Sequence, residues 1–124
     1  MIQQLKTSHS LILTLVDASF YSYLAMSAAT NESQQAFNRV LHAIADPTRR
    51  RILQVLKKAP SDHLGLCASD IELKIHLSQP TISHHMAVLQ KAGLVDARKQ
   101  GLWRWYRRNE GALSAFIRKL RRSL

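Results

Sequence analysis

Apolar residues recur at helical spacing from Gln34 onward. They lie at positions i, i+3, i+4 and i+7, a spacing that predicts an amphipathic helix with one buried face. The residues of this stripe are Phe37, Val40, Leu41 and Ile44. We expect the helix to end at Asp46-Pro47. Asp46 can cap the following helix, and proline suits a first helical position because no amide hydrogen is needed there.

Two more helices are predicted before residue 77. The second helix buries an apolar face behind a basic run, Arg49–Arg51; that face contains Ile52, Leu53 and Leu56. The basic run has two interpretations, a solvated face or a contact with phosphate. Residues 59–65 are interpreted as a loop. A short helix is expected at roughly residues 68–74, with Cys67 or Ser69 near its start and Ile71 and Ile75 facing inward.

Residues 77–93 carry the most informative pattern. Ser78 suits an N-cap, Pro80 lies in the first turn, and Gly93 is a natural helix stop. One face is apolar, through Ile82, Met86 and Leu89. The opposite face is expected to be exposed and polar, with Pro80, Thr81, Ser83, His84 and Lys91. Such a helix fits a DNA major groove, because its first-turn amides can bind phosphate and its side chains can reach base edges.

Two β-prone runs follow, residues 94–98 and 102–107, joined by Lys99-Gln100-Gly101. This pattern predicts a hairpin, since glycine can take a positive φ in the turn. Its basic residues Arg98, Lys99 and Arg104 are expected to reach phosphates or a minor groove. The aromatic residues of the second run are expected to alternate between core and surface: Trp103 or Trp105, and Tyr106.

A last helix repeats the amphipathic stripe, with Leu113, Phe116, Ile117 and Leu120 on one side. Its other side is basic and carries Arg118, Lys119, Arg121 and Arg122. The predicted fold is therefore mainly α with a small β-hairpin, in the order of a winged helix-turn-helix.

An apolar N-terminal arm, residues 1–30, precedes the predicted domain at residues 31–124. Asp17 is the only charged residue between Lys6 and Glu32. Polar residues dilute the apolar run below the ~20 predominantly apolar residues of a membrane span. Four interpretations stay open: a transmembrane helix, a signal peptide with its core at residues 11–16, an upstream extension with Met26 as the natural start, and an extra helix that covers a hydrophobic surface of the domain or its dimer.

Length and charge narrow the range of functions that the chain can have. The chain has 124 residues and a net charge of +10, distributed as −1 over residues 1–46 and +11 over residues 47–124. A basic domain of this size favours an anionic partner such as nucleic acid. The single cysteine supplies neither an internal disulfide nor a structural zinc site by itself. The sequence shows no paired carboxylates, nucleophile with base, phosphate loop or cofactor fingerprint, so we expect no enzyme, cofactor or metal.

Three segments carry a family resemblance. They are residues 45–53 (Ala-Asp-Pro-Thr-Arg-Arg-Arg-Ile-Leu), residues 77–86 (Leu-Ser-Gln-Pro-Thr-Ile-Ser-His-His-Met) and Ala92-Gly93-Leu94-Val95, followed by Gly101, Trp103 and Tyr106 on the wing. Residues 34–124 resemble the ArsR/SmtB family of bacterial dimeric transcriptional repressors. The resemblance implies that the first and last helices of the domain form a dimer interface and that the helix from Ser78 enters the major groove.

The expected function is that of a sequence-specific, cytoplasmic transcriptional regulator that binds double-stranded DNA. The resemblance favours a homodimeric repressor released from an inverted-repeat operator by an unidentified signal. The alternative is a weakly specific architectural nucleic-acid-binding protein. The expected DNA-binding residues are Ser78, Gln79, Pro80, Thr81, Ser83, His84, Arg98, Lys99, Arg104 and Arg49. The expected dimerisation residues are Phe37, Val40, Leu41, Leu113, Phe116, Ile117 and Leu120.

The sensing sites of the family are incomplete in this chain. Family members that detect thiophilic metals resemble one another in a Cys-x-Cys at the third helix, whereas here Ser69 follows Cys67. The last helix lacks the Asp and His of the family's zinc sensors. Cys67 is a candidate redox sensor, although a small buried side chain is favoured. A metal cluster of Asp62, His63 and Cys67 is disfavoured, and His85 is interpreted as a packed, hydrogen-bonded histidine.

Overall fold

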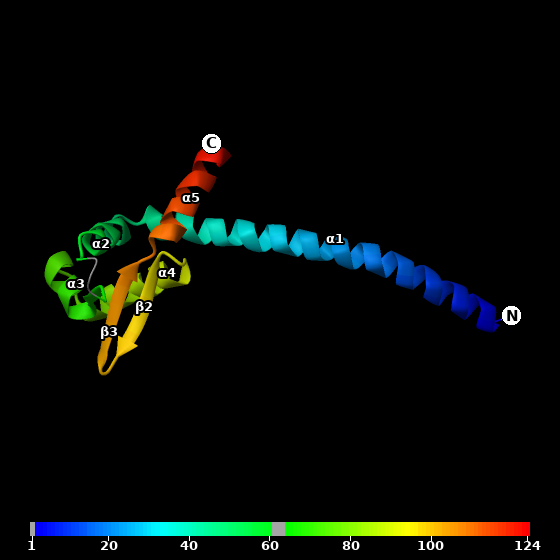
Figure 1. Ribbon diagram of the computed structural model, residues 1–124, viewed down its shortest axis with the longest axis horizontal. Helices are drawn as coiled ribbons and strands as arrows, with labels where there is room; N and C mark the ends of the chain where they lie inside the picture. Colours follow the sequence, from blue (N-terminus) through cyan, green and yellow to red (C-terminus); the bar gives the residue numbers. More distant parts are fainter. Residues whose placement is uncertain (1, 61–63) are drawn as a thin grey trace. The chain divides into compact units, whose positions relative to one another are not determined.

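The computed structural model describes residues 2–60 and 64–124, with side chains from Ala18 onward. The chain divides into two units, Met1–Gln35 and Ala36–Leu124. The elements, of which Figure 1 labels all but β1, are α1 (Ile2–Ala45), α2 (Pro47–Lys57), β1 (Leu66–Cys67), α3 (Ala68–Ile75), α4 (Gln79–Lys91), β2 (Val95–Gln100), β3 (Trp103–Arg108) and α5 (Glu110–Ser123).

Helix α1 is longer than the sequence pattern predicts. The apolar stripe indicated a helix from Gln34, whereas the helix is continuous from Ile2 to Ala45. The physical reason is that the first 46 residues contain neither glycine nor proline, the two residues that most strongly interrupt a helix. The described side chains from Ala18 to Ala36 are all exposed. Among the described residues, no helix is both long and apolar enough to cross a membrane.

The junction between α1 and α2 forms as predicted. Asp46 is the N-cap of α2, and its Oδ1 accepts a hydrogen bond of 3.0 Å from the Arg49 amide. Pro47 occupies the first helical position, where its missing amide hydrogen costs nothing. The buried face of α2 contains Ile52, Leu53 and Leu56, as predicted, and also Arg49.

Helices α3 and α4 form the helix-turn-helix. Helix α3 ends at His76, whose backbone is left-handed with φ of 63°. Ser78 is the N-cap of α4, and the helix buries Ile82, Met86 and Leu89. The sequence prediction is confirmed for the start of α4 and for its buried face.

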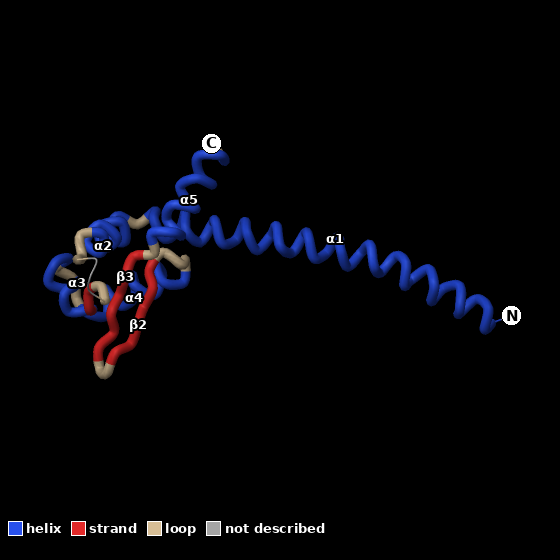
Figure 2. The backbone as a smooth tube through the Cα atoms, in the orientation of Figure 1, coloured by secondary structure: helices blue, strands red, loops and turns tan. Residues whose placement is uncertain are grey.

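The sheet has one strand more than the predicted hairpin. Strands β2 and β3 pair antiparallel, and β1 pairs with the other edge of β3, where Leu66 faces Tyr106 and Cys67 faces Trp105. Figure 2 shows the hairpin in red, with its turn away from the helices. Residues 66–67 lie outside the predicted strands because a two-residue strand has too few positions to show alternation. Gly65 is required next to β1, since an added Cβ would lie 2.0 Å from the Tyr106 carbonyl oxygen.

The hairpin turn begins two residues later than predicted and has two residues instead of three. Gln100 pairs with Trp103, so Gly101 and Leu102 form a two-residue turn, and Lys99 and Gln100 belong to β2. Gly101 has φ of +62°, at the first turn position where a type II′ turn requires glycine.

One core holds residues 36–124 together. The largest fully buried side chains come from α2, α3, α4 and the segment that enters β2: Ile52, Ile71, Ile82, Met86, Leu89, Leu94 and Val95. Tyr106 of β3 joins this core, while Trp103 is exposed and Trp105 is half-buried. The aromatic alternation is therefore confirmed, and the fold is a winged helix-turn-helix.

Candidate nucleic-acid interface

One face of α4 is exposed at the start of the helix. Its side chains are the ones that the sequence placed there: Ser78, Gln79, Pro80, Thr81, Ser83 and His84, all exposed. The opposite face is held by Ile82 and Met86, which are 0% and 1% exposed. Helix α4 contains no acidic residue. The arrangement presents short polar side chains on a helix whose rotation is fixed by the core.

The first turn of α4 keeps donors at its surface. Within the described residues, the Ser78 side chain caps no backbone amide, and its hydroxyl lies 2.9 Å from the hydroxyl of Thr81. Amides in the first turn of a helix have no partner inside the helix, and the helix dipole favours an anion there. This end of α4 is therefore suited to a phosphate oxygen.

The wing supplies positive charge. Arg98, Lys99 and Arg104 are exposed, and Lys99 lies directly opposite Arg104 in the strand register. Like charges opposite one another destabilise a strand pair, so this pair would be stabilised by a bound anion. Apolar residues also reach the turn, since Leu102 is 98% and Trp103 is 60% exposed. No role was predicted for Leu102 from the sequence. Its exposure follows from its position in the two-residue turn, where the side chain has no neighbouring strand to pack against.

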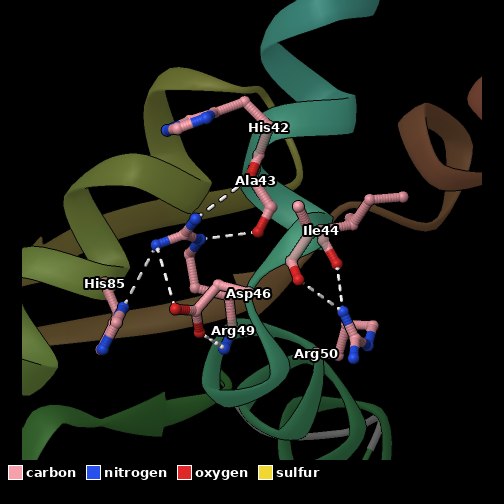
Figure 3. Close-up of polar contacts among 8 residues, drawn as sticks. His42, Ala43, Ile44, Asp46, Arg49, Arg50 and His85 are labelled. Atoms are coloured by element: carbon pink, nitrogen blue, oxygen red, sulfur yellow. Dashed lines mark hydrogen bonds and ion pairs between the residues drawn. The ribbon is translucent and has the colours of Figure 1, made fainter.

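Arg49 does not fit the prediction that it contacts DNA. Its side chain is buried, with 7% of the residue exposed. Its Nε donates to the Ala43 carbonyl at 2.6 Å, and its Nη2 donates to the His42 carbonyl at 3.0 Å (Figure 3). Because the Arg49 guanidinium is buried and directed to carbonyls of its own chain, it is not presented to a phosphate at the surface. The signal was available, because Arg49 lies on the same helical stripe as Ile52, Leu53 and Leu56.

Arg50 and Arg51, its neighbours, are exposed. Arg50 donates from Nη1 to the carbonyls of Ile44 and Ala45, at 2.7 and 2.9 Å. Two consecutive arginines of the basic run therefore close the carboxyl end of α1. Such hydrogen bonds satisfy carbonyls that have no partner within the helix.

His85 is half-buried next to Arg49, with its Nδ1 3.4 Å from the Arg49 Nη1. The prediction of a packed, hydrogen-bonded histidine is thus confirmed. Burial lowers the pKa of His85 below its ordinary value; the Asp46 carboxylate opposes this change, and the charges of Arg49 and His84 add to it. The pKa of Asp46 is itself lowered, chiefly by the hydrogen bond from the Arg49 amide.

Cys67 is a buried N-cap of α3. Its Sγ donates to the Asp70 carboxylate at 3.0 Å and lies 3.0 Å from the Ser69 hydroxyl. These contacts support the interpretation of a packed side chain. Among the described residues, no three His, Cys, Asp or Glu side chains group around a metal position. Asp62 and His63, which the disfavoured metal cluster needs, lie outside the described residues.

The apolar residues expected at a dimer interface differ in exposure. Ile117 is 60% and Leu41 is 36% exposed, whereas Phe116 is 7% exposed. Phe37, Val40, Leu113 and Leu120 are half-buried. Phe116 packs on Phe37 with ring centroids 5.3 Å apart, so α5 is anchored to the end of α1 within one chain.

Known proteins share this sequence and fold. Residues 46–97 match the model of the bacterial regulatory proteins of the arsR family. The chain is 40% identical over 75 residues to an HTH-type transcriptional regulator, MJ1325, of Methanocaldococcus jannaschii. The aligned region covers 60% of this chain and 80% of that protein. It is 37% identical over 80 residues to the transcriptional repressor SdpR of Bacillus subtilis, covering 64% of this chain and 83% of that protein.

The fold also matches a solution structure. The homodimeric winged helix-turn-helix DNA-binding domain Mb0332 of Mycobacterium bovis superposes with a TM-score of 0.61 at 23% identity, covering 76% of this chain and 83% of that one. That likeness shows the fold. The identity to the curated relatives over most of their length, together with the family match, shows that this chain belongs to the ArsR family of bacterial DNA-binding transcriptional regulators.

Proposed function

We propose that the protein is a sequence-specific repressor that binds an inverted-repeat operator as a homodimer and leaves it in response to a signal. The observation that carries this proposal is the one-sided burial of α4. Its inner face is fixed by Ile82, Met86 and Leu89, and its outer face presents Thr81, Ser83 and His84. A helix with this division can enter a major groove and offer side chains to base edges.

The wing supports the same assignment. Its exposed cations, Arg98, Lys99 and Arg104, would bind phosphates beside the groove that α4 enters. Phosphate contacts determine affinity and salt dependence, whereas Gln79, Thr81, Ser83 and His84 would determine sequence preference.

Dimerisation is proposed through α5 and the part of α1 from Ala36 to Ala45. Exposed or half-buried apolar residues on these segments support it, with Leu41 and Ile117 the most open. A two-fold dimer would place two α4 helices one helical turn of DNA apart, about 34–36 Å, which requires an inverted repeat. Repression is proposed because SdpR is a transcriptional repressor.

The test is a titration of the protein against its own upstream DNA and against a scrambled sequence, across salt concentrations. We expect the upstream DNA to bind at least ~10³-fold more tightly, the gap of specific binders. Binding of the two DNAs within about tenfold would overturn the proposal in favour of an architectural protein. Adding metal ions or a thiol oxidant to the same titration tests for the releasing signal.

Thr81→Ala sharpens the test on α4. Loss of a base contact costs ~1–3 kcal/mol at one step of the site, so the preference for the upstream DNA should fall while scrambled DNA binds as before. Ser22→Ala is the matched control, because Ser22 is an exposed hydroxyl residue of α1 outside the segments proposed for DNA binding and dimerisation. Full operator preference in Thr81→Ala would show that α4 is not the reading helix.

A further inference from the structure

Arg49 joins three elements with one side chain. Its guanidinium donates to the His42 and Ala43 carbonyls at the end of α1, and its backbone belongs to α2. Its third contact is with His85 of α4, where Nη1 lies 3.4 Å from Nδ1 (Figure 3). The carboxylate of Asp46 completes the cluster, with Oδ2 3.9 Å from Nη1. One planar group with several fixed donors can hold this geometry, which a lysine ammonium cannot reproduce.

The contact to α4 depends on the protonation of His85. Nδ1 accepts a hydrogen bond from Arg49 only while it carries no proton. A protonated His85 would instead place a second positive charge beside a guanidinium that is held in place by α1. The charged and titratable groups around His85 are Arg49 from α2, Asp46 from the α1–α2 junction, His84 from α4 and, beyond Arg49, His42 from α1.

We propose that Arg49 is a positioning residue that ties α4 to the end of α1 through neutral His85, so that operator binding weakens in mild acid when His85 is protonated. The inference rests on the proposed function, because it needs α4 to read DNA. The proposed contact couples α1, which carries dimerisation residues, to α4, which carries the base-contacting residues, and this coupling depends on pH.

The position of α4 matters because a dimer must match two half-sites at once. Their separation is fixed by the DNA, so a small shift of α4 relative to α1 moves both reading helices out of register. The lowered pKa of His85 agrees with this arrangement, since the folded protein favours the neutral imidazole. His85 is next to His84 in the chain, so a change in the contact between Arg49 and His85 occurs directly beneath the exposed face of α4.

The experiment measures operator affinity from about pH 8 to about pH 5.5, a range that spans the ordinary histidine pKa. The variants are His85→Gln, which keeps an acceptor for Arg49 but does not titrate, and the control His76→Asn. His76 is an exposed histidine outside the cluster, and asparagine tolerates its left-handed backbone. Each protein is normalised to its own affinity at the highest pH, so that pH effects common to all the proteins cancel in the comparison.

We expect the wild type and His76→Asn to lose affinity relative to His85→Gln by about tenfold at the acid end, which corresponds to about 1.4 kcal/mol of binding free energy. Arg49→Lys should bind the operator less tightly at every pH, with no pH response from His85. Parallel curves for wild type and His85→Gln would overturn the coupling while leaving operator preference, and hence the proposed function, intact. A wild type with no preference for upstream DNA would overturn both.

Folding is checked by circular dichroism for each variant. If Arg49→Lys does not fold, the His85→Gln comparison decides the question. An NMR titration of the wild type supplies a second reading, because protonation of His85 should shift the Arg49 Nε–H resonance in the same pH range. An Arg49 resonance that does not follow His85 would also overturn the coupling.

Discussion

Arginine serves opposite purposes at the α1–α2 junction and on the wing. At the junction, Arg49 is 7% exposed and its donors are directed to backbone carbonyls of the same chain. On the wing, Arg98 and Arg104 are exposed, and Arg104 faces another cation, Lys99. Both regions contribute to the basic character of residues 47–124, yet the first organises the domain and the second is available to DNA.

The comparison teaches that the partner of a charge, not its sign, determines its role. A buried guanidinium is retained only where hydrogen bonds satisfy it, and its loss leaves other buried groups without a partner. An exposed cation has little effect on folding and acts on whatever anion approaches it. Substitutions in the two regions should therefore change different properties. A substitution at the junction should lower the stability of the fold, and a substitution on the wing should lower the affinity for DNA.

The largest expected effect is on folding at the junction. Arg49→Met removes the donors to the His42 and Ala43 carbonyls and should lower the free energy of unfolding by about 2–4 kcal/mol. Arg98→Met, the matched wing variant, should change it by less than ~0.5 kcal/mol. Denaturant unfolding followed by circular dichroism measures both. Equal stabilities for the two variants would contradict the conclusion that Arg49 stabilises the fold and Arg98 does not.

The next effect is on DNA affinity at the wing. Lys99→Ala should weaken binding to upstream and scrambled DNA alike, and should reduce the slope of log affinity against log salt by about 1, because one phosphate contact is lost. Lys58→Ala, at an exposed lysine that caps the carboxyl end of α2, is the control. A salt slope that stays at its wild-type value in Lys99→Ala would remove the wing from the interface.

A smaller effect is the pH dependence of stability at His85. Because burial lowers the pKa of His85 in the folded chain, the unfolded chain binds more protons near the ordinary histidine pKa, and stability falls as pH falls through that range. His85→Gln should flatten this part of the profile, measured by denaturant unfolding at a series of pH values. A profile as steep in the variant as in the wild type would assign the dependence to other groups.

The smallest effect is expected at the start of α5. The Arg108 guanidinium donates to Glu110 at 2.6 and 2.7 Å, and this contact holds the pKa of Glu110 below its ordinary value. The ion pair is exposed, so Glu110→Gln should cost only a few tenths of a kcal/mol. That contribution is present above the ordinary carboxyl pKa and is lost as pH falls below it. Thermal unfolding at pH 7 and in acid measures it, and a loss comparable with Arg49→Met would contradict the comparison.

The sequence predicts the elements of residues 36–124 well and the environment of single charges poorly. Helix α4 is predictable because its stripe, N-cap and stop residue agree. The exposed face of α4 follows from the same periodicity. The burial of Arg49 is harder to predict, since a charge run is ordinarily solvated, and only its spacing from Ile52, Leu53 and Leu56 places it inward.

The remaining differences between the predicted and the observed structure concern segments that are too short to show a periodic pattern, or contacts between residues far apart in the sequence. Strand β1 has two residues, and its pairing with β3 is set by the close approach at Gly65. The shift of the hairpin turn to Gly101 and Leu102 depends on strand register. The contact between Arg49 and His85 joins residues 36 positions apart, which no local pattern shows.

The central claim is that the exposed face of α4 and the wing bind DNA, and backbone amide NMR shifts on adding upstream DNA test it most directly. We predict that the largest shifts occur from Ser78 to His84 and from Arg98 to Arg104. Arg49 should show a smaller change, transmitted through His85. Shifts confined to residues 18–35, or to α5, with α4 unchanged, would contradict the account.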